Sequence, residues 1–216
     1  MCGERLESQF AESLCGMCRR TEPHFVKAAA YGSYEGSLRG PIHLLKYDHV
    51  RPAARVLGRM LADAISDLRP SFGERLPIIV PVPLHRTKLH ERGFNQSEEI
   101  VRAAIKHLPG FQMSTKVLVR QRATASQIGL TRHQRRENLR GAFGVVAADH
   151  IAARDVLLVD DVYTTGTTVS ECARILRRSG ASRVFVATVA RVLRAEPAAA
   201  ASNIVREEEG SLAATA

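Results

Sequence analysis

Short apolar runs alternate with amphipathic segments along the middle of the chain. The runs at 78–84, 116–120, 155–160 and 182–192 are rich in valine, isoleucine and leucine, as strands buried on both faces are. Segments between them carry apolar residues at helical spacing, most clearly at 168–180. Strands that alternate with helices form a parallel sheet covered on both sides, so the pattern predicts an α/β fold.

The chain divides into four predicted regions. Residues 1–30 carry three cysteines, and residues 31–76 combine a Gly-rich irregular start with an amphipathic helix at 49–68. Residues 77–194 hold the alternating strands and helices, and the tail at 195–216 is Ala-rich and then polar, which is typical of disorder. We therefore expect a Cys-rich knuckle, a linker or hood segment, an α/β core and a disordered tail.

The composition agrees with a folded domain and argues against a membrane or secreted protein. Of the 216 residues, 45% are apolar and 25% are charged, which suffices for a core. No apolar run approaches the ~20 residues that a membrane-spanning helix needs, and the N-terminus lacks the apolar stretch of a secretory signal. The sequence therefore predicts a cytoplasmic protein with no membrane span.

Positive charge is concentrated in the middle of the chain. The formal net charge is +9, and the segment from Leu84 to Ala142 holds twelve basic residues against four acids. An excess of this kind favours polyanionic partners such as nucleic acid or phosphorylated metabolites.

Two adjacent carboxylates precede a loop rich in hydroxyl groups. Asp160 and Asp161 come at the end of an apolar strand, the position where open parallel sheets bind ligands. The helix that begins near Thr168 aims its N-terminal N–H groups back at the loop, and Gly166 allows close approach of an anion. The carboxylates must then face a vicinal diol, a metal ion or both. Phosphate, diol and metal together describe a ribose 5-phosphate.

The segment VLLVDDVYTTGTT, residues 156–168, resembles the 5-phosphoribosyl-1-pyrophosphate (PRPP) motif of type I phosphoribosyltransferases. The resemblance implies a parallel sheet flanked by helices, in which Asp160 and Asp161 hold the ribose hydroxyls with Mg²⁺ nearby. Purine-salvage members carry an Asp where this chain has Thr164, so a hypoxanthine-type role is disfavoured. The residues that the resemblance assigns to the 5-phosphate are Thr164, Thr165, Gly166, Thr167 and Thr168.

Two further blocks, residues 80–101 and 120–143, resemble the ComF family of competence-associated proteins, which includes GntX relatives. The resemblance extends over roughly residues 2–192. It implies a role in competence and DNA uptake, with PRPP or a related phosphoribosyl compound as ligand and a protein of the competence machinery as a further partner.

The loop after the first core strand should face the same edge of the sheet as Asp160. Arginine binds phosphate oxygens bidentately, which suits this loop to a pyrophosphate. Asn95 and Gln96 follow it and are better explained as the cap of the next helix. The residues predicted on the pyrophosphate side are His85, Arg86, Lys88 and Arg92.

The basic stretch 122–140 is long and poor in apolar residues. It resembles the mobile loop that closes over PRPP in related enzymes and excludes water. A solvated basic surface is the alternative. The predicted loop residues are Arg122, Gln127, Arg132, Arg136 and Arg140.

Three N-terminal cysteines suggest a metal site. Cys15 and Cys18 form a complete C-x-x-C pair, whereas Cys2 matches only the second half of the first pair in the family's four-cysteine zinc knuckle. We expect Zn²⁺ with an incomplete ligand set here, and a native start upstream of residue 1 would supply the missing cysteine. His24 is a weaker alternative ligand. Cys172 lies in a helical pattern and reads as a buried thiol.

The start MCG also resembles the nucleophile of glutamine-dependent PRPP amidotransferases. However, about 75 residues before the first core strand are too few for a glutaminase domain, so that activity is excluded.

Two functional hypotheses remain. The first is a PRPP-binding, Mg²⁺-dependent protein that transfers a phosphoribosyl group to an unidentified nitrogen acceptor. The second is a non-catalytic competence factor that retains the PRPP or nucleotide site and binds single-stranded DNA through its basic face.

Overall fold

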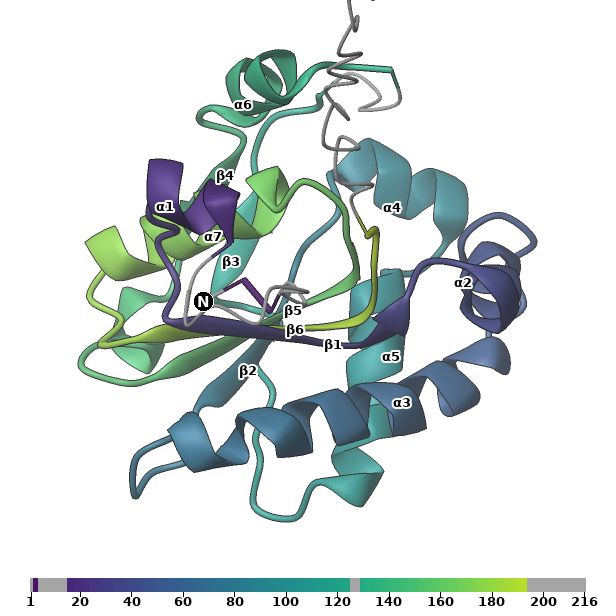
Figure 1. Cartoon of the computed structure of the whole chain (residues 1–216), viewed down its shortest axis with the longest axis horizontal. Coiled ribbons are helices and arrows are strands. Elements are labelled where there is room, and N and C mark those ends of the chain that lie inside the picture. Colours follow the sequence, from purple (N-terminus) through teal and green to yellow (C-terminus); the bar gives the residue numbers. More distant parts are fainter. Residues whose placement is uncertain (1, 4–14, 125–128, 194–216) are drawn as a thin grey trace, which may run out of the picture.

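The computed structural model describes residues 2–3, 15–124 and 129–193, and it contains one main sheet of parallel strands (Figure 1). The strand order across the sheet is β1, β6, β5, β2, and every neighbouring pair is parallel. The α/β fold with a parallel sheet is therefore confirmed. The strands are β1 (Lys27–Ser33), β2 (Ile78–Pro81), β5 (Val156–Tyr163) and β6 (Val184–Arg191).

Helices cover both faces of this sheet (Figure 1). One face is covered by α2 (Arg39–Lys46), α3 (Ala53–Leu68) and α5 (Gln96–Ala104), and the other by α7 (Thr167–Arg178). No helix among the described residues has the length and apolar character needed to cross a membrane. The shorter helices are α1 (Gly16–Arg20), α4 (Arg86–Arg92) and α6 (Arg132–Leu139), with 3₁₀ turns at Gly36–Leu38, Arg69–Ser71, Ile105–His107 and Ala148–His150.

Alternation along the strands builds a separate hydrophobic layer on each face. Leu157 and Phe185 pack on the side of α3 and α5, whereas Leu158 and Val186 pack on the side of α7. All four are fully buried. Burying a side chain of this size stabilises the fold by about 1.5–3 kcal/mol, which explains why both faces of these strands are apolar.

The apolar run at 116–120 does not join the main sheet. It forms β3 (Leu118–Arg120), which pairs antiparallel with β4 (Phe143–Val145) in a separate two-stranded ribbon. Leu118 and Phe143 pack on the α7 side of the core. The prediction of another parallel strand was wrong, because an apolar run indicates burial but not the partner strand.

The N-terminal part of the chain contributes directly to the core sheet. β1 is an edge strand that pairs with β6, so the boundary predicted at residue 30 falls inside a strand. The helices expected at 49–68 and 168–180 are present as α3, which begins four residues later than expected and ends at Leu68 as expected, and α7, whose ends differ by one and two residues.

Candidate functional site

The carboxyl ends of β2 and β5, called the carboxyl edge here, lie where the chain leaves the two strands toward opposite faces. After β2 the chain continues to α5 on one face, and after β5 it continues to α7 on the other. Neighbouring parallel strands that diverge in this way create the usual ligand position of open α/β sheets. β5 extends to Tyr163, beyond the register of β2, which ends opposite Val159.

Asp160 and Asp161 lie on this extension of β5 and are held by different partners. The Ser97 hydroxyl donates to Oδ1 of Asp160 at 3.1 Å, and the backbone N–H of Asp161 donates to the same oxygen at 3.0 Å. Oδ1 of Asp161 accepts from the backbone N–H of Val162 at 2.8 Å. Both carboxylates are thus oriented by the protein itself.

Lys46, at the end of α2, reaches across to the carboxylate of Asp161. Its Nζ lies 2.6 Å from Oδ2 of Asp161, and both side chains are largely buried. Burial disfavours charge on Lys46, but Asp161 more than compensates and raises the pKa of Lys46 above its ordinary value. Within the described residues, Oδ2 of Asp161 has no well-aligned hydrogen bond. The contact between Lys46 and Oδ2 of Asp161 is therefore a largely buried ion pair.

Asp160 forms no ion pair with a cation in the part of the chain that the structure describes. Burial and then the negative charge of Asp161 raise the pKa of Asp160 to about 7. A raised carboxyl pKa means that the ionised form is disfavoured here. An added cation or a hydrogen-bond donor would relieve that cost, and so the acid pair favours ligands of this kind.

The loop after β5 turns sharply at Gly166 before α7 begins. Gly166 has a φ of +75°, and a Cβ placed there would collide with the Tyr163 ring. The Thr165 and Thr167 hydroxyl oxygens lie 2.8 Å apart. The first N–H groups of any α-helix have no partner within the helix, and no side chain caps those of α7 within the described residues. These features give the loop the character of an anion site.

Comparison with known proteins agrees with this arrangement. Residues 96–206 match the family described as phosphoribosyl transferase domain. The DNA utilization protein YhgH of Escherichia coli K12 is 35% identical over 180 residues, which cover 83% of this chain and 78% of that protein. The chain is a member of the ComF family within the phosphoribosyltransferase superfamily.

Two named competence proteins lie in the same family. Competence protein F of Haemophilus influenzae is 33% identical over 192 residues, covering 88% of this chain and 82% of that protein. Competence protein ComFC of Bacillus subtilis is 24% identical over 132 residues, or 60% of this chain and 50% of that protein.

The residues predicted on the pyrophosphate side of this ComF protein lie on the short helix α4. His85 caps the helix, its Nδ1 accepting from the Thr87 N–H at 3.3 Å. Lys88 is exposed and pairs with Glu91 at 3.1 Å, and Arg92 donates to Gln96. Asn95 caps α5 through the Ser97 N–H, which confirms its predicted structural role. The pyrophosphate role of His85, Arg86, Lys88 and Arg92 stays a prediction.

The predicted basic loop of the ComF protein includes a helix between β3 and β4. α6 opens with a capping box between Thr131 and Gln134. Arg122 donates to the backbone oxygens of Asn138 and Arg140 at 2.8 and 2.9 Å, so it braces the end of α6. Gln127 lies outside the described residues. Of the other predicted loop residues, α6 contains Arg132 and Arg136, and Arg140 follows it.

Arg120 is a cation near the carboxyl edge that was not predicted from the sequence. Burial lowers its pKa, while Cys172 and Asp160 act in the opposite direction. Its guanidinium stacks 5.4 Å from the centre of the Phe143 ring, and Nε is buried without a hydrogen bond inside the described part of the chain.

Sequence reasoning also missed Ser97 and Lys46. The N-cap signal at Asn95 places Ser97 in the first turn of α5, and this offered a hint. Nothing in the local pattern around Lys46 points to Asp161.

Cys2, Cys15 and Cys18 converge in space as the sequence suggested. Their sulfur atoms all lie within 4.8 Å of one another, and the Cys2 and Cys15 sulfurs are 3.4 Å apart. Tetrahedral thiolates on one Zn²⁺ lie about 3.8 Å apart, so the spacing fits. Burial raises the pKa of the Cys18 thiol to about 12, a cost that a bound metal ion would remove. Among the described residues no fourth ligand, including His24, joins the group.

The cysteine cluster is connected to the loop of Gly166 through Arg191. Arg191 Nη1 donates to the backbone oxygen of Cys2 at 2.8 Å, and its guanidinium lies 5.2 Å from the centre of the Tyr163 ring. Tyr163 in turn packs over Gly166.

Cys172 is fully buried in α7, and burial raises the pKa of its thiol well above the ordinary value.

Proposed function

We propose that this ComF protein binds PRPP together with Mg²⁺ at the carboxyl edge and can transfer the phosphoribosyl group to a nitrogen acceptor. One observation carries the proposal: the oriented acid pair of Asp160 and Asp161 is followed at once by the left-handed turn at Gly166 and the uncapped start of α7. The first feature suits a diol or a cation, and the second suits a phosphate.

The acid pair supports a magnesium ion on chemical grounds. Mg²⁺ prefers carboxylate oxygens, and among the described residues Oδ2 of Asp161 contacts Lys46 alone, through an ion pair. When bound, the ion would neutralise pyrophosphate charge. Lys46 would then be free to contact the ligand, since its ammonium could turn from Asp161 to a phosphate oxygen.

In the proposed transfer, the bond between C1 of the ribose and a pyrophosphate oxygen breaks, and pyrophosphate leaves with the electron pair. A nitrogen of the acceptor forms the new bond at C1 and its proton passes to water. The predicted contributors on the leaving-group side are Arg86, Lys88 and the basic stretch, joined by Arg120. The loop at 164–168 would hold the 5-phosphate through N–H groups and hydroxyls.

Titration calorimetry with PRPP, with and without Mg²⁺, tests the proposal. We expect Mg²⁺-dependent binding by the wild type and its loss in Asp160→Asn/Asp161→Asn. The double variant Asp63→Asn/Asp67→Asn is a matched control, because it removes two exposed carboxylates of α3 and should bind like wild type. Equal binding by both double variants, or none by the wild type, would contradict a PRPP site here. Release of pyrophosphate with candidate amines would then test transfer.

The names of the relatives, DNA utilization protein and competence protein, support a role in the uptake or use of DNA. The polar helix α6 and its C-cap Arg140 favour a direct contact with nucleic acid, since His133, Arg136 and Arg140 are exposed, and among residues 133–140 Leu139 alone is buried. We expect single-stranded DNA binding that weakens steeply with salt and is reduced by Arg136→Gln/Arg140→Gln. Competition between PRPP and DNA would place both at one surface.

We also propose that Cys2, Cys15 and Cys18 bind Zn²⁺. Metal analysis should find zinc in the wild type and little in Cys15→Ser/Cys18→Ser, while Cys172→Ala, outside the cluster, retains it. Equal zinc in both variants would refute the assignment.

A further inference from the structure

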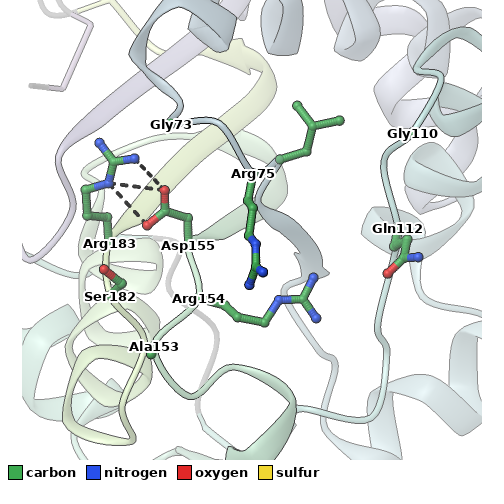
Figure 2. Close-up of a pocket in the computed structure, with 10 residues that line it drawn as sticks. Gly73, Arg75, Gly110, Gln112, Ala153, Arg154, Asp155, Ser182 and Arg183 are labelled. Carbon is green, nitrogen blue, oxygen red and sulfur yellow. Dashed lines mark hydrogen bonds and ion pairs between the residues drawn. The ribbon is translucent and has the colours of Figure 1, made fainter.

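The amino ends of the strands, called the amino edge here, hold a cavity of about 730 Å³ (Figure 2). Its walls are formed by the segments that lead into β2, β5 and β6, together with the turn after α5. β5 runs from Val156 to Tyr163, so Asp160 at the carboxyl edge lies five positions along the strand from Asp155 in this cavity. At about 3.3 Å per residue the two positions are roughly 16 Å apart, so this cavity is separate from the proposed PRPP position.

One arginine of the cavity is already neutralised. Arg183 forms a bidentate ion pair with Asp155, with Nη2 2.5 Å from Oδ2 and Nε 3.1 Å from both carboxylate oxygens. This is the planar geometry in which guanidinium and carboxylate satisfy one another. Among the described residues, Asp155 is the only acid that lines the cavity, so none of their carboxylates remains in the lining for the other cations.

Two further arginines face the same space. Figure 2 shows the side chains of Arg75 and Arg154 pointing into the cavity, while Arg183 turns toward Asp155. Neither Arg75 nor Arg154 makes a side-chain hydrogen bond or ion pair with another residue in 2–3, 15–124 or 129–193. Two guanidinium groups that line one cavity repel one another, and an anion bound between them removes that repulsion.

The other residues that line the cavity favour an anion that also carries hydroxyl or other polar groups. Gln112 and Ser182 add an amide and a hydroxyl to the walls, and only Leu76 contributes a large apolar side chain. The volume lies in the range of small-molecule sites, about 300–1,000 Å³. Guanidinium groups bind phosphate oxygens in pairs, and polar walls suit a sugar or another hydroxylated group.

We propose that the amino-edge cavity binds a phosphorylated small molecule of nucleotide size, with Arg75 and Arg154 holding its phosphate. The site does not depend on PRPP binding at the carboxyl edge. It would allow the protein to respond to a second phosphorylated compound.

Hydrogen exchange measured by mass spectrometry tests the site locally, with pyrophosphate and ADP as probes in the absence of Mg²⁺. We expect both probes to slow amide exchange in the segments 72–77, 110–113 and 152–155 of the wild-type chain. In Arg75→Gln/Arg154→Gln this protection should disappear at the probe concentrations that protect the wild type. The affinity of each probe, obtained from protection of these segments against probe concentration, should fall at least about ten-fold, as expected for the loss of charge-assisted hydrogen bonds.

Arg55→Gln/Arg59→Gln is the matched control, because it removes the same charge from exposed positions on α3. Its protection pattern should equal that of the wild type, and thermal unfolding of both variants should confirm that they fold. The proposal is overturned if neither probe protects these segments, or if protection is the same in both double variants. Protection by a 5′-phosphorylated oligonucleotide but by neither small probe would also overturn it, in favour of a nucleic-acid site.

Discussion

The two edges of the sheet handle charge in opposite ways. At the carboxyl edge, the buried carboxylate of Asp161 lies next to the partly buried Asp160, and Lys46 comes from a distant helix to pair with Asp161. At the amino edge, Asp155 forms an ion pair with Arg183, and Arg75 and Arg154 line the cavity with no second acid among its described lining residues. One edge has an excess of buried negative charge and the other an excess of accessible positive charge. Each therefore favours a ligand of complementary charge.

The largest effect should follow from removing the cation at the carboxyl edge. Lys46→Met leaves Asp161 buried without a counter-ion and should lower the free energy of unfolding by about 3 kcal/mol, measured by urea denaturation. Lys88→Met is the control, because its exposed ion pair with Glu91 should contribute no more than about 0.5 kcal/mol. Adding Asp161→Asn to Lys46→Met should recover part of the loss. Equal decreases in the unfolding free energy of the two lysine variants would show that the buried ion pair stabilises the fold no more than the exposed one does.

The pH dependence of stability should reveal the free-energy cost of ionising Asp160 in the folded state. Its folded-state pKa of about 7 lies above that of an unfolded aspartate, so the folded state binds more protons in this range. The contribution of Asp160 is fully present below about pH 4 and is lost as the pH rises through about 7. Without Mg²⁺, the unfolding free energy of the wild type relative to Asp160→Asn should fall by on the order of 2 kcal/mol across this window. A flat difference would mean that Asp160 is not perturbed.

Two glycines with nearly the same φ allow the cost of a left-handed backbone to be measured separately from the cost of a steric clash with neighbouring side chains. Gly166 and Gly93 have φ values of +75° and +76°, but a Cβ meets Tyr163 at the first and nothing within 4 Å at the second. Gly93→Ala should cost about 1 kcal/mol, and Gly166→Ala about 1 kcal/mol more. Thermal or urea unfolding measures both. Adding Tyr163→Leu to Gly166→Ala should remove most of the additional loss of stability relative to Gly93→Ala. Equal losses in the two single glycine variants would argue against the packing of Tyr163 over the loop.

The smallest expected effect is at the amino edge and has the opposite sign. Asp155→Asn releases Arg183 and adds one uncompensated cation to the cavity. Pyrophosphate should then bind about three-fold more tightly in the same exchange experiment, an effect that weakens with salt. Unchanged or weaker binding would mean that the charge balance of the cavity does not control affinity.

Much of the fold was predictable because it depends on near neighbours in the chain. The period of apolar residues identified α3, α7 and the strands β2, β5 and β6, and the spacing of acids and threonines identified the loop around Gly166. The partner of the run at 116–120 was not predictable, since the antiparallel ribbon of β3 and β4 depends on a pairing across the basic stretch.

By itself, the sequence determined the alternation of strands and helices, the position of Asp160 and Asp161 after an apolar strand, and the cap at Asn95. These features depend on residues that are close along the chain. Only the tertiary structure decided that Lys46 neutralises Asp161, that Ser97 holds Asp160, and that Arg75 and Arg154 line one cavity at the opposite edge. The physical reason is that such contacts depend on which elements pack side by side, and local periodicity carries no information about that choice.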